Sequence, residues 1–222
     1  ETITNSGTIS ANDDNGLWTK GTITTITNTA SGTISAGDDN GIKVVAGAEV
    51  TSITNAGTIS AGRDFGIRVD RSNAKEAKVT TITNSGTISA AVDSGIWNDG
   101  EIGTITNSGT IKATNQDYGI KNVNGGVIDL LNNSGTISAG DDYGIYNDSD
   151  SEIKSLRNTG TISAAGNNIS NFNDTDSTIG TLSNLQGASS SALTYKGKLP
   201  DYYKVIVGSA SNFGMVTFSN PS

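Results

Sequence analysis

The feature of this sequence that most constrains its fold is a repeat of about 25 residues. Each copy contains short segments with isolated aliphatic residues, separated by Gly, Asn and Asp. No segment has the i, i+3, i+4, i+7 apolar stripe of a helix, whereas Thr and Ile favour extended backbone. The repeat therefore predicts several short strands per copy. Its marker is the glycine of a Gly-Thr-Ile motif, found at Gly7, Gly32, Gly57, Gly86, Gly109, Gly135 and Gly160.

A unit of this length buries its aliphatic face only when it stacks on copies of itself, with neighbouring strands about 4.8 Å apart. The period is too long for a hexapeptide helix, and right-handed crossovers are the strong default. The sequence therefore predicts an all-β fold, a right-handed parallel β-helix (β-solenoid) with seven clear rungs and a decaying eighth. We expect residues 1–184 to form the repeats and residues 185–222 to form a C-terminal cap.

The composition excludes several kinds of chemistry. The chain has no Cys and no His, which rules out thiolate nucleophiles, imidazole bases, disulfides and ordinary zinc sites. A net charge of -8 argues against nucleic acid as a partner, and no apolar run is long enough to insert into a membrane. Catalysis by paired carboxylates needs one special pair, and the rungs are uniform. We therefore expect a protein that is not an enzyme.

Two series of asparagines recur at fixed places in the repeat. Stacked Asn amides hydrogen-bond up and down a column and satisfy turn backbone that lacks a ladder partner. We therefore predict a structural ladder of asparagines two residues before the repeat glycine, and a second column later in the rung. The ladder consists of Asn5, Asn55, Asn84, Asn107, Asn133 and Asn158, and the second column of Asn98, Asn122 and Asn147.

A carboxylate stands two residues before a second glycine in six consecutive rungs. Stacked carboxylates repel one another, so they must be neutralised or held apart. One interpretation is an Asx turn by each Asp onto the following backbone. The other is calcium bound between successive turns, the one cofactor for which the sequence gives an argument. The six residues are Asp14, Asp39, Asp64, Asp93, Asp117 and Asp142.

Aromatic residues collect beside the same turns, at Phe65, Tyr118 and Tyr143 before the glycine and at Trp18, Trp97 and Tyr146 after it. Each of the latter follows an inward aliphatic residue, so we expect the rings to be at least partly exposed. Rings beside carboxylates are typical of sugar binding, although they also serve as padding of a turn surface. The candidate ligand-binding residues are Asp117, Asp142, Tyr118, Tyr143, Trp97, Tyr146 and Arg71.

Arg71 belongs to an insertion in the longest rung, residues 69–78. Loops that project from a solenoid often carry specificity, and a solvated protrusion is the other interpretation.

Outward Thr and Ser form ranks that resemble the ice-binding faces of β-solenoid antifreeze proteins. They flank the repeat isoleucine, and Lys112 interrupts them. Soluble strand residues of no special function are the alternative. The Thr-x-Ser rank consists of Thr8/Ser10, Thr33/Ser35, Thr58/Ser60, Thr87/Ser89, Thr136/Ser138 and Thr161/Ser163. A second, Thr-x-Thr rank consists of Thr2/Thr4, Thr25/Thr27, Thr81/Thr83 and Thr104/Thr106.

Rungs of the type Ile-Thr-Asn-Ser-Gly-Thr-Ile-Ser resemble the β-helical passenger domains of bacterial autotransporters, and the resemblance covers residues 1–184. The tail, from Leu199-Pro200-Asp201 to Ser211-Asn212-Phe213-Gly214, looks like the autochaperone-type segment that caps such passengers upstream of a barrel. We expect its aromatics, Tyr195, Tyr202, Tyr203, Phe213 and Phe218, to cover that end.

The resemblance implies an adhesin-like or stalk segment that is extracellular or on the bacterial cell surface, anchored to the outer membrane in a longer protein. Its partner would be a glycan or protein of a host or environmental surface, and the segment would be a monomer. A passive structural spacer and an ice-binding protein are the alternative functions.

Overall fold

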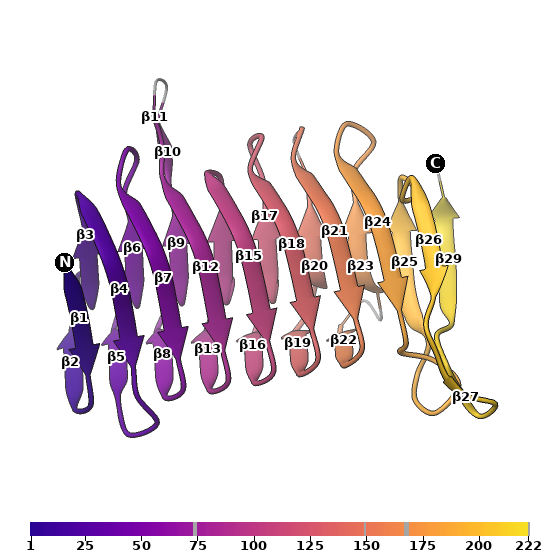
Figure 1. Cartoon of the computed structure of the whole chain (residues 1–222), viewed down its shortest axis with the longest axis horizontal. Helices are drawn as coiled ribbons and strands as arrows, with labels where there is room; N and C mark the ends of the chain where they lie inside the picture. The colour runs from indigo at the N-terminus through magenta and orange to yellow at the C-terminus, as the bar shows by residue number, and fades with distance from the viewer. Residues whose placement is uncertain (73–74, 149, 167–168, 222) are drawn as a thin grey trace.

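The computed structural model describes residues 1–72, 75–148, 150–166 and 169–221, with the side chains of residues 169–172 and 220–221 left aside. The described part consists of strands and turns, which confirms the all-β prediction. The strands stack into three long parallel sheets that follow the axis of the solenoid (Figure 1). The solenoid has about 8 turns, with roughly 25 residues per rung.

Each of the three sheets takes one strand from nearly every rung. Sheet A consists of β1 (Thr2–Asn5), β4 (Thr22–Asn28), β7 (Glu49–Asn55), β12 (Lys78–Asn84), β15 (Glu101–Asn107), β18 (Val127–Asn133), β21 (Glu152–Asn158), β24 (Thr178–Asn184) and β26 (Tyr202–Val205). Sheet B consists of β2 (Thr8–Ala11), β5 (Thr33–Ala36), β8 (Thr58–Ala61), β13 (Thr87–Ala90), β16 (Thr110–Ala113), β19 (Thr136–Ala139) and β22 (Thr161–Ala164). Sheet C consists of β3 (Leu17–Thr19), β6 (Ile42–Val44), β9 (Ile67–Val69), β14 (Ile96–Asn98), β17 (Ile120–Asn122), β20 (Tyr143–Asn147), β23 (Ile169–Asn173), β25 (Leu193–Gly197) and β29 (Val216–Pro221).

The coil is right-handed, as predicted. In Figure 1 the strands of sheet A run downward in front, the strands of sheet C return upward behind, and the chain advances from left to right. Two antiparallel hairpins project from the solenoid. They are β10 (Arg71–Ser72) with β11 (Lys75–Glu76), and β27 (Val207–Ser209) with β28 (Asn212–Phe213).

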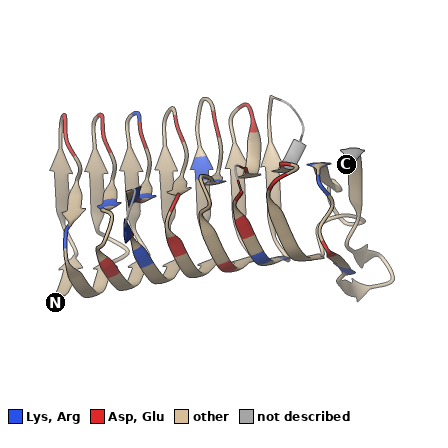
Figure 2. Cartoon of the chain, turned by 90° about the horizontal axis from the view of Figure 1, so that it is seen from above, with Lys and Arg blue, Asp and Glu red and all other residues tan. Residues whose placement is uncertain are grey.

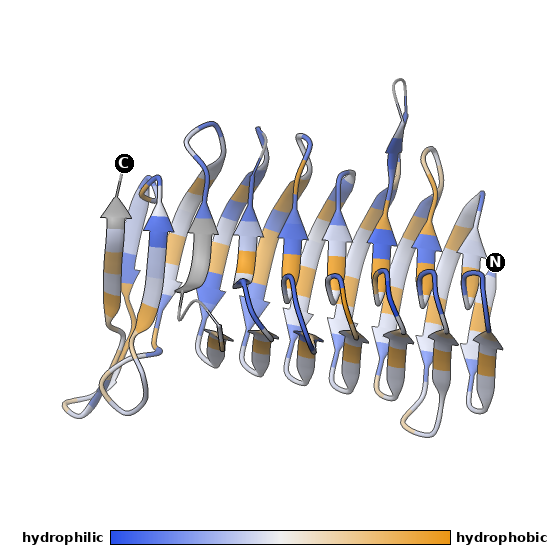
Figure 3. Ribbon diagram, turned by 180° about the vertical axis from the view of Figure 1, so that it is seen from behind, coloured by the Kyte–Doolittle hydropathy of each residue, from blue (hydrophilic) through white to orange (hydrophobic). Residues whose placement is uncertain are grey.

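The core is a narrow stack of aliphatic side chains inside the three sheets. Inward and outward residues alternate along each strand, as the bands of Figure 3 show. Because the pairing is in register, like lies on like: Ile82 pairs with Ile53 below it and Ile105 above it. All three are fully buried. Each such side chain contributes about 1.5–3 kcal/mol of hydrophobic stabilisation.

The predicted asparagine ladder is confirmed, and it is longer than predicted. Successive side chains are linked by hydrogen bonds from Nδ2 to Oδ1, for example 2.8 Å from Asn107 to Asn133. Asn28 and Asn184 also belong to it. The sequence pattern missed Asn28 because its turn is longer, so that it stands four residues before Gly32 instead of two.

The second asparagine column is confirmed from Asn98 through Asn122 to Asn147, and it continues to Asn173. It begins at Asn98 because Val69 occupies the equivalent position of the preceding rung. Val69 has no side-chain donor, so Asn98 Oδ1 is buried without a hydrogen-bond partner.

The C-terminal segment continues two of the three sheets. Strand β26 extends sheet A, and β25 and β29 extend sheet C, whereas sheet B ends at β22. Tyr195 is fully buried, and Tyr203 packs against the core. Tyr202, however, is 68% exposed, because it lies on the outward face of β26. The prediction that it covers the end is therefore wrong.

Candidate functional site

A column of aromatic and cationic side chains runs along sheet C, and we call it the aromatic–cation column. Each member directly follows an inward aliphatic residue, so its side chain points outward. The parallel register places the members above one another. They are Trp18, Lys43, Arg68, Trp97, Lys121 and Tyr146.

Two cations of this column, Arg68 and Lys121, lie close to aromatic rings. Lys121 Nζ is 4.5 Å from the centre of the Trp97 ring and 4.8 Å from that of Tyr118. On the other side of Trp97, Arg68 Cζ is 5.8 Å from the ring centre. Each contact of this kind contributes about 0.5–1 kcal/mol at an exposed site. Trp97 therefore lies between two positively charged side chains. Arg68 and Lys43 also form ion pairs with Asp70.

Three tyrosines form a stacked group at the C-terminal end of the column. The ring centres of Tyr118 and Tyr146 are 4.4 Å apart, and Tyr143 lies 5.9 Å from Tyr118. Burial raises the pKa of Tyr118 and Tyr146, with neighbouring carboxylates adding to the shift. Both hydroxyls are therefore protonated, and Tyr146 donates a hydrogen bond to Asp148 Oδ2 at 2.6 Å.

The predicted exposure of the rings holds for most of them. Trp18 is 52% exposed, and Trp97, Tyr118, Tyr143 and Tyr146 are half-buried. Phe65 is the exception, because only 5% of it is exposed. Its ring lies 4.6 Å from that of Trp97, which comes from the next rung and packs over it. For Phe65 the prediction is wrong.

The six predicted carboxylates recur at the same turn of successive rungs. Figure 2 shows Asp and Glu along a row of turns at one side of the solenoid. Asp14 accepts hydrogen bonds from both the backbone N and Nδ2 of Asn15. Burial, followed by a hydrogen bond with Asp117, raises the pKa of Asp93 to about 7. Burial and the charge of Asp39 raise the pKa of Asp64. The expected repulsion is therefore relieved partly by a shared proton.

The part of the chain that the structure describes contains no preformed set of calcium ligands. No three or more Asp and Glu side chains there lie close enough together to hold a metal ion. Asp93 and Asp117 instead interact as a pair. Calcium at Asp14, Asp39, Asp64, Asp93, Asp117 and Asp142 stays a prediction.

The Thr and Ser ranks lie on sheet B in strict register. Thr87 pairs with Thr58 and Thr110, and Ser89 pairs with Ser60 and Lys112. The side chains on either side of the buried isoleucine are partly exposed, as the pattern of β13 illustrates. Sheet B therefore presents an in-register rank of hydroxyl groups, interrupted at Lys112, that is separate from the aromatic–cation column.

Arg71 is not a member of the column. It lies on the β10–β11 hairpin, where it pairs with Glu76 and donates a hydrogen bond from Nη1 to Asn124 O at 2.8 Å. The column also contains residues that the aromatic pattern did not predict, namely Lys43, Arg68 and Lys121. Their signal is positional, since each stands two residues after the second glycine, where other rungs have a ring.

Comparison with models of protein families, with curated proteins and with solved structures found no match. The described residues include no helix that could cross a membrane. What the structure defines is a class of architecture, a parallel β-solenoid repeat protein.

Proposed function

We propose that this chain is a non-enzymatic, extracellular or cell-surface segment of the autotransporter-passenger type. It acts as a rigid stalk, and its aromatic–cation column binds glycans, or protein surfaces, of a host or the environment. In the longer protein an outer-membrane barrel anchors it, and the segment itself is monomeric. The 25-residue repeat and the resemblance of its rungs to those of autotransporter passengers support this proposal.

The observation that carries the proposal is the register of the column. Trp97 lies between Arg68 and Lys121, and the stacked tyrosines belong to the next two rungs. Sugars bind to proteins through apolar ring faces and through hydroxyl contacts to charged and amide groups. The column supplies the rings and cations, and the neighbouring turns supply the carboxylates.

A glycan array probed with the whole chain tests this proposal. We expect binding to a defined set of glycans, and loss of that binding in the double variant Lys121→Ala/Tyr146→Ala. Tyr202→Ala is the matched control, because Tyr202 is an exposed ring on sheet A, outside the aromatic–cation column. An array with no binding for the wild-type chain would favour the passive spacer instead.

Ice binding is a second candidate function, and the register of sheet B favours it. The hydroxyl rank from Thr8 to Thr161 is in register and repeats at the strand spacing. Thermal hysteresis with shaping of ice crystals would support this function, and its loss in Thr87→Tyr would place the effect on sheet B. Freezing identical to that of a buffer control excludes it.

A further inference from the structure

In several rungs two side chains near the second glycine lie against each other. One directly precedes that glycine, and the other, a member of the aromatic–cation column, stands three residues later. The pairs are Phe65 with Arg68, Tyr118 with Lys121, and Tyr143 with Tyr146. The rung of β14 differs, because a small residue, Ser94, precedes its glycine. Trp97 therefore lacks a large neighbour in its own rung, and its ring lies over Phe65 of the preceding rung, with 4.6 Å between the ring centres.

In this covered position the Trp97 ring leaves two polar atoms buried. Trp97 Nε1 and Ser94 Oγ both lie out of reach of solvent, and neither has a hydrogen-bond partner among the described residues. A buried polar group without a partner costs free energy that hydration would return. The covered position of the ring therefore carries a penalty from both atoms.

The contacts that hold the ring in the covered position are individually weak. They are the contact with Phe65 and the two cations beside the ring, Arg68 at 5.8 Å and Lys121 at 4.5 Å from its centre. Ring–ring contacts and exposed cation–ring contacts are no stronger than the penalty of a buried polar group without a partner. The covered position and a hydrated one are therefore close in free energy.

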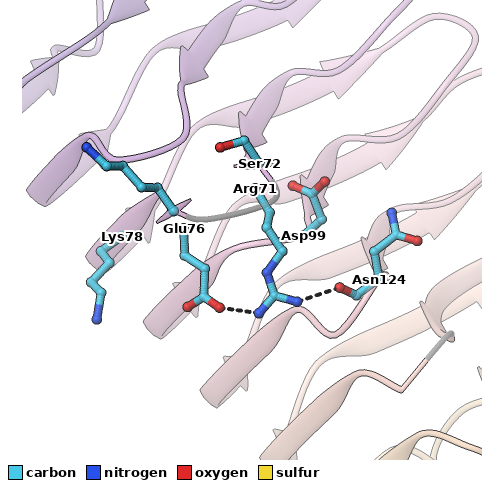
Figure 4. Close-up of a pocket in the computed structure, with 7 residues that line it drawn as sticks. Arg71, Ser72, Glu76, Lys78, Asp99 and Asn124 are labelled. Atoms are coloured by element: carbon cyan, nitrogen blue, oxygen red, sulfur yellow. Dashed lines mark hydrogen bonds and ion pairs between the residues drawn. The ribbon is translucent and has the colours of Figure 1, made fainter.

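The backbone around Trp97 is held on both sides, so the side chain alone reaches a hydrated position. Strand β14 is paired in register with β9 and with β17. Beyond its end, Arg71 joins the β10–β11 hairpin to the turn of Asn124 through a hydrogen bond of 2.8 Å to the Asn124 carbonyl oxygen (Figure 4). Because Trp97 points outward from β14, rotation of its side chain moves the ring into solvent without breaking a strand pair.

We propose that Trp97 is a lid over Phe65. In the open position the Trp97 ring turns away from the solenoid, Nε1 and Ser94 Oγ become hydrated, and the face of the Phe65 ring is exposed. An apolar ring face beside an indole N–H donor is suited to bind one sugar ring. This role of Phe65 in sugar binding rests on the function proposed for the column, whereas the motion of the lid does not.

Exchange of the Trp97 indole N–H with water tests the lid in the free chain. The proton is observed by NMR in the whole chain with isotope-labelled tryptophan, and Trp18→Phe assigns its signal. We expect exchange that does not respond to low concentrations of urea, because rotation of one side chain exposes little surface. Ser94→Ala should slow the exchange about tenfold, since the covered position then buries one polar group fewer. Ser6→Ala, at an exposed serine of the first rung, should leave the rate unchanged.

Global unfolding is the other route by which this proton can exchange, and its response to urea is steep. The lid is overturned if the exchange rate rises with urea in parallel with global unfolding. It is also overturned if Ser94→Ala leaves the rate unchanged or raises it. A raised rate would show that the Ser94 hydroxyl holds the ring down, for example through a buried water.

A glycan array tests the role of Phe65 separately. Phe65→Leu, with its melting temperature measured to show that the chain is folded, should lose the glycans that the wild-type chain binds. Equal binding by the two chains would refute a contact between Phe65 and the sugar. An array on which the wild-type chain binds nothing would refute that contact together with the function proposed for the column. Neither array result changes what the exchange rates say of the lid.

Discussion

The side-chain amide of Gln186 pairs with the backbone of Ile162, where the next strand of sheet B would otherwise pair. Its Oε1 accepts a hydrogen bond from Ile162 N at 2.7 Å, and its Nε2 donates one to Ile162 O at 3.1 Å. Among the described residues, sheet B has no strand beyond β22, so the backbone of this edge strand needs other partners. The side-chain amide presents the same donor and acceptor as a peptide group, and it is itself buried.

Replacing Gln186 with Leu should therefore destabilise the chain by about 2–4 kcal/mol, because it leaves the N and O of Ile162 buried without partners. Urea denaturation measures the change. Gln116→Leu is the matched control, since Gln116 is exposed in a turn and should change stability by less than about 0.5 kcal/mol. Equal effects of the two substitutions would contradict the role of Gln186.

The asparagine ladder predicts a strong contrast between two adjacent residues. Asn133 is fully buried and bonds to Asn107 below and Asn158 above, whereas Asn132 points outward. Asn133→Ala should lower the free energy of unfolding by about 2–4 kcal/mol, because several buried partners lose their hydrogen bonds. Asn132→Ala should have little effect. A small loss of stability in Asn133→Ala would show that the turns do not depend on the ladder.

Alanine substitutions at two repeat glycines should differ in their cost to stability, because one glycine lies inside the stack and the other lies in its first rung. A Cβ on Gly135 would collide with the carbonyl oxygen of Gly109, because the turns of neighbouring rungs are packed backbone to backbone. Gly7, in the same place of the first rung, has open space around it. Gly135→Ala should therefore cost about 3 kcal/mol or more, and Gly7→Ala less than about 0.5 kcal/mol. Thermal unfolding of the two variants measures this, and similar melting temperatures would be the contrary result.

The raised pKa of Asp93 predicts a pH dependence of stability. In the unfolded chain the carboxyl ionises near its usual pKa, and in the folded chain it ionises only near 7. Between these values the folded state binds the extra proton, so this group's contribution to stability falls as the pH rises from about 4 to about 7. Asp93→Asn should remove that fall, and Asp13→Asn, at an exposed carboxylate, should keep it. Melting curves across this pH range measure the difference; parallel profiles for Asp93→Asn and the wild type would contradict it.

Much of the fold could be predicted because each rung stacks on a similar one. The spacing of the repeat glycines determines which residues share a column, and the Asn and Ile columns follow from that. Asn28 escaped the pattern because two more residues in its turn shift it away from the glycine. Gln186 lies where the repeat has ended, so no neighbouring rung indicates its partner.

The candidate site was predicted less completely. The column position of Trp97 followed from the repeat, but Lys121 and Arg68 were missed because a search for rings passes over the cations between them. The burial of Phe65 depends on how a side chain of the next rung packs, which spacing does not reveal.

The central functional proposal is that the aromatic–cation column binds a glycan, and the two tryptophans of the chain provide a direct probe. Both Trp18 and Trp97 belong to the column. Fluorescence titration with a glycan selected on the array should give a saturable change that is lost in Lys121→Ala/Tyr146→Ala and kept in Tyr202→Ala. A glycan that binds the chain with no change in tryptophan fluorescence, or equally well to the column variant, would contradict the proposal.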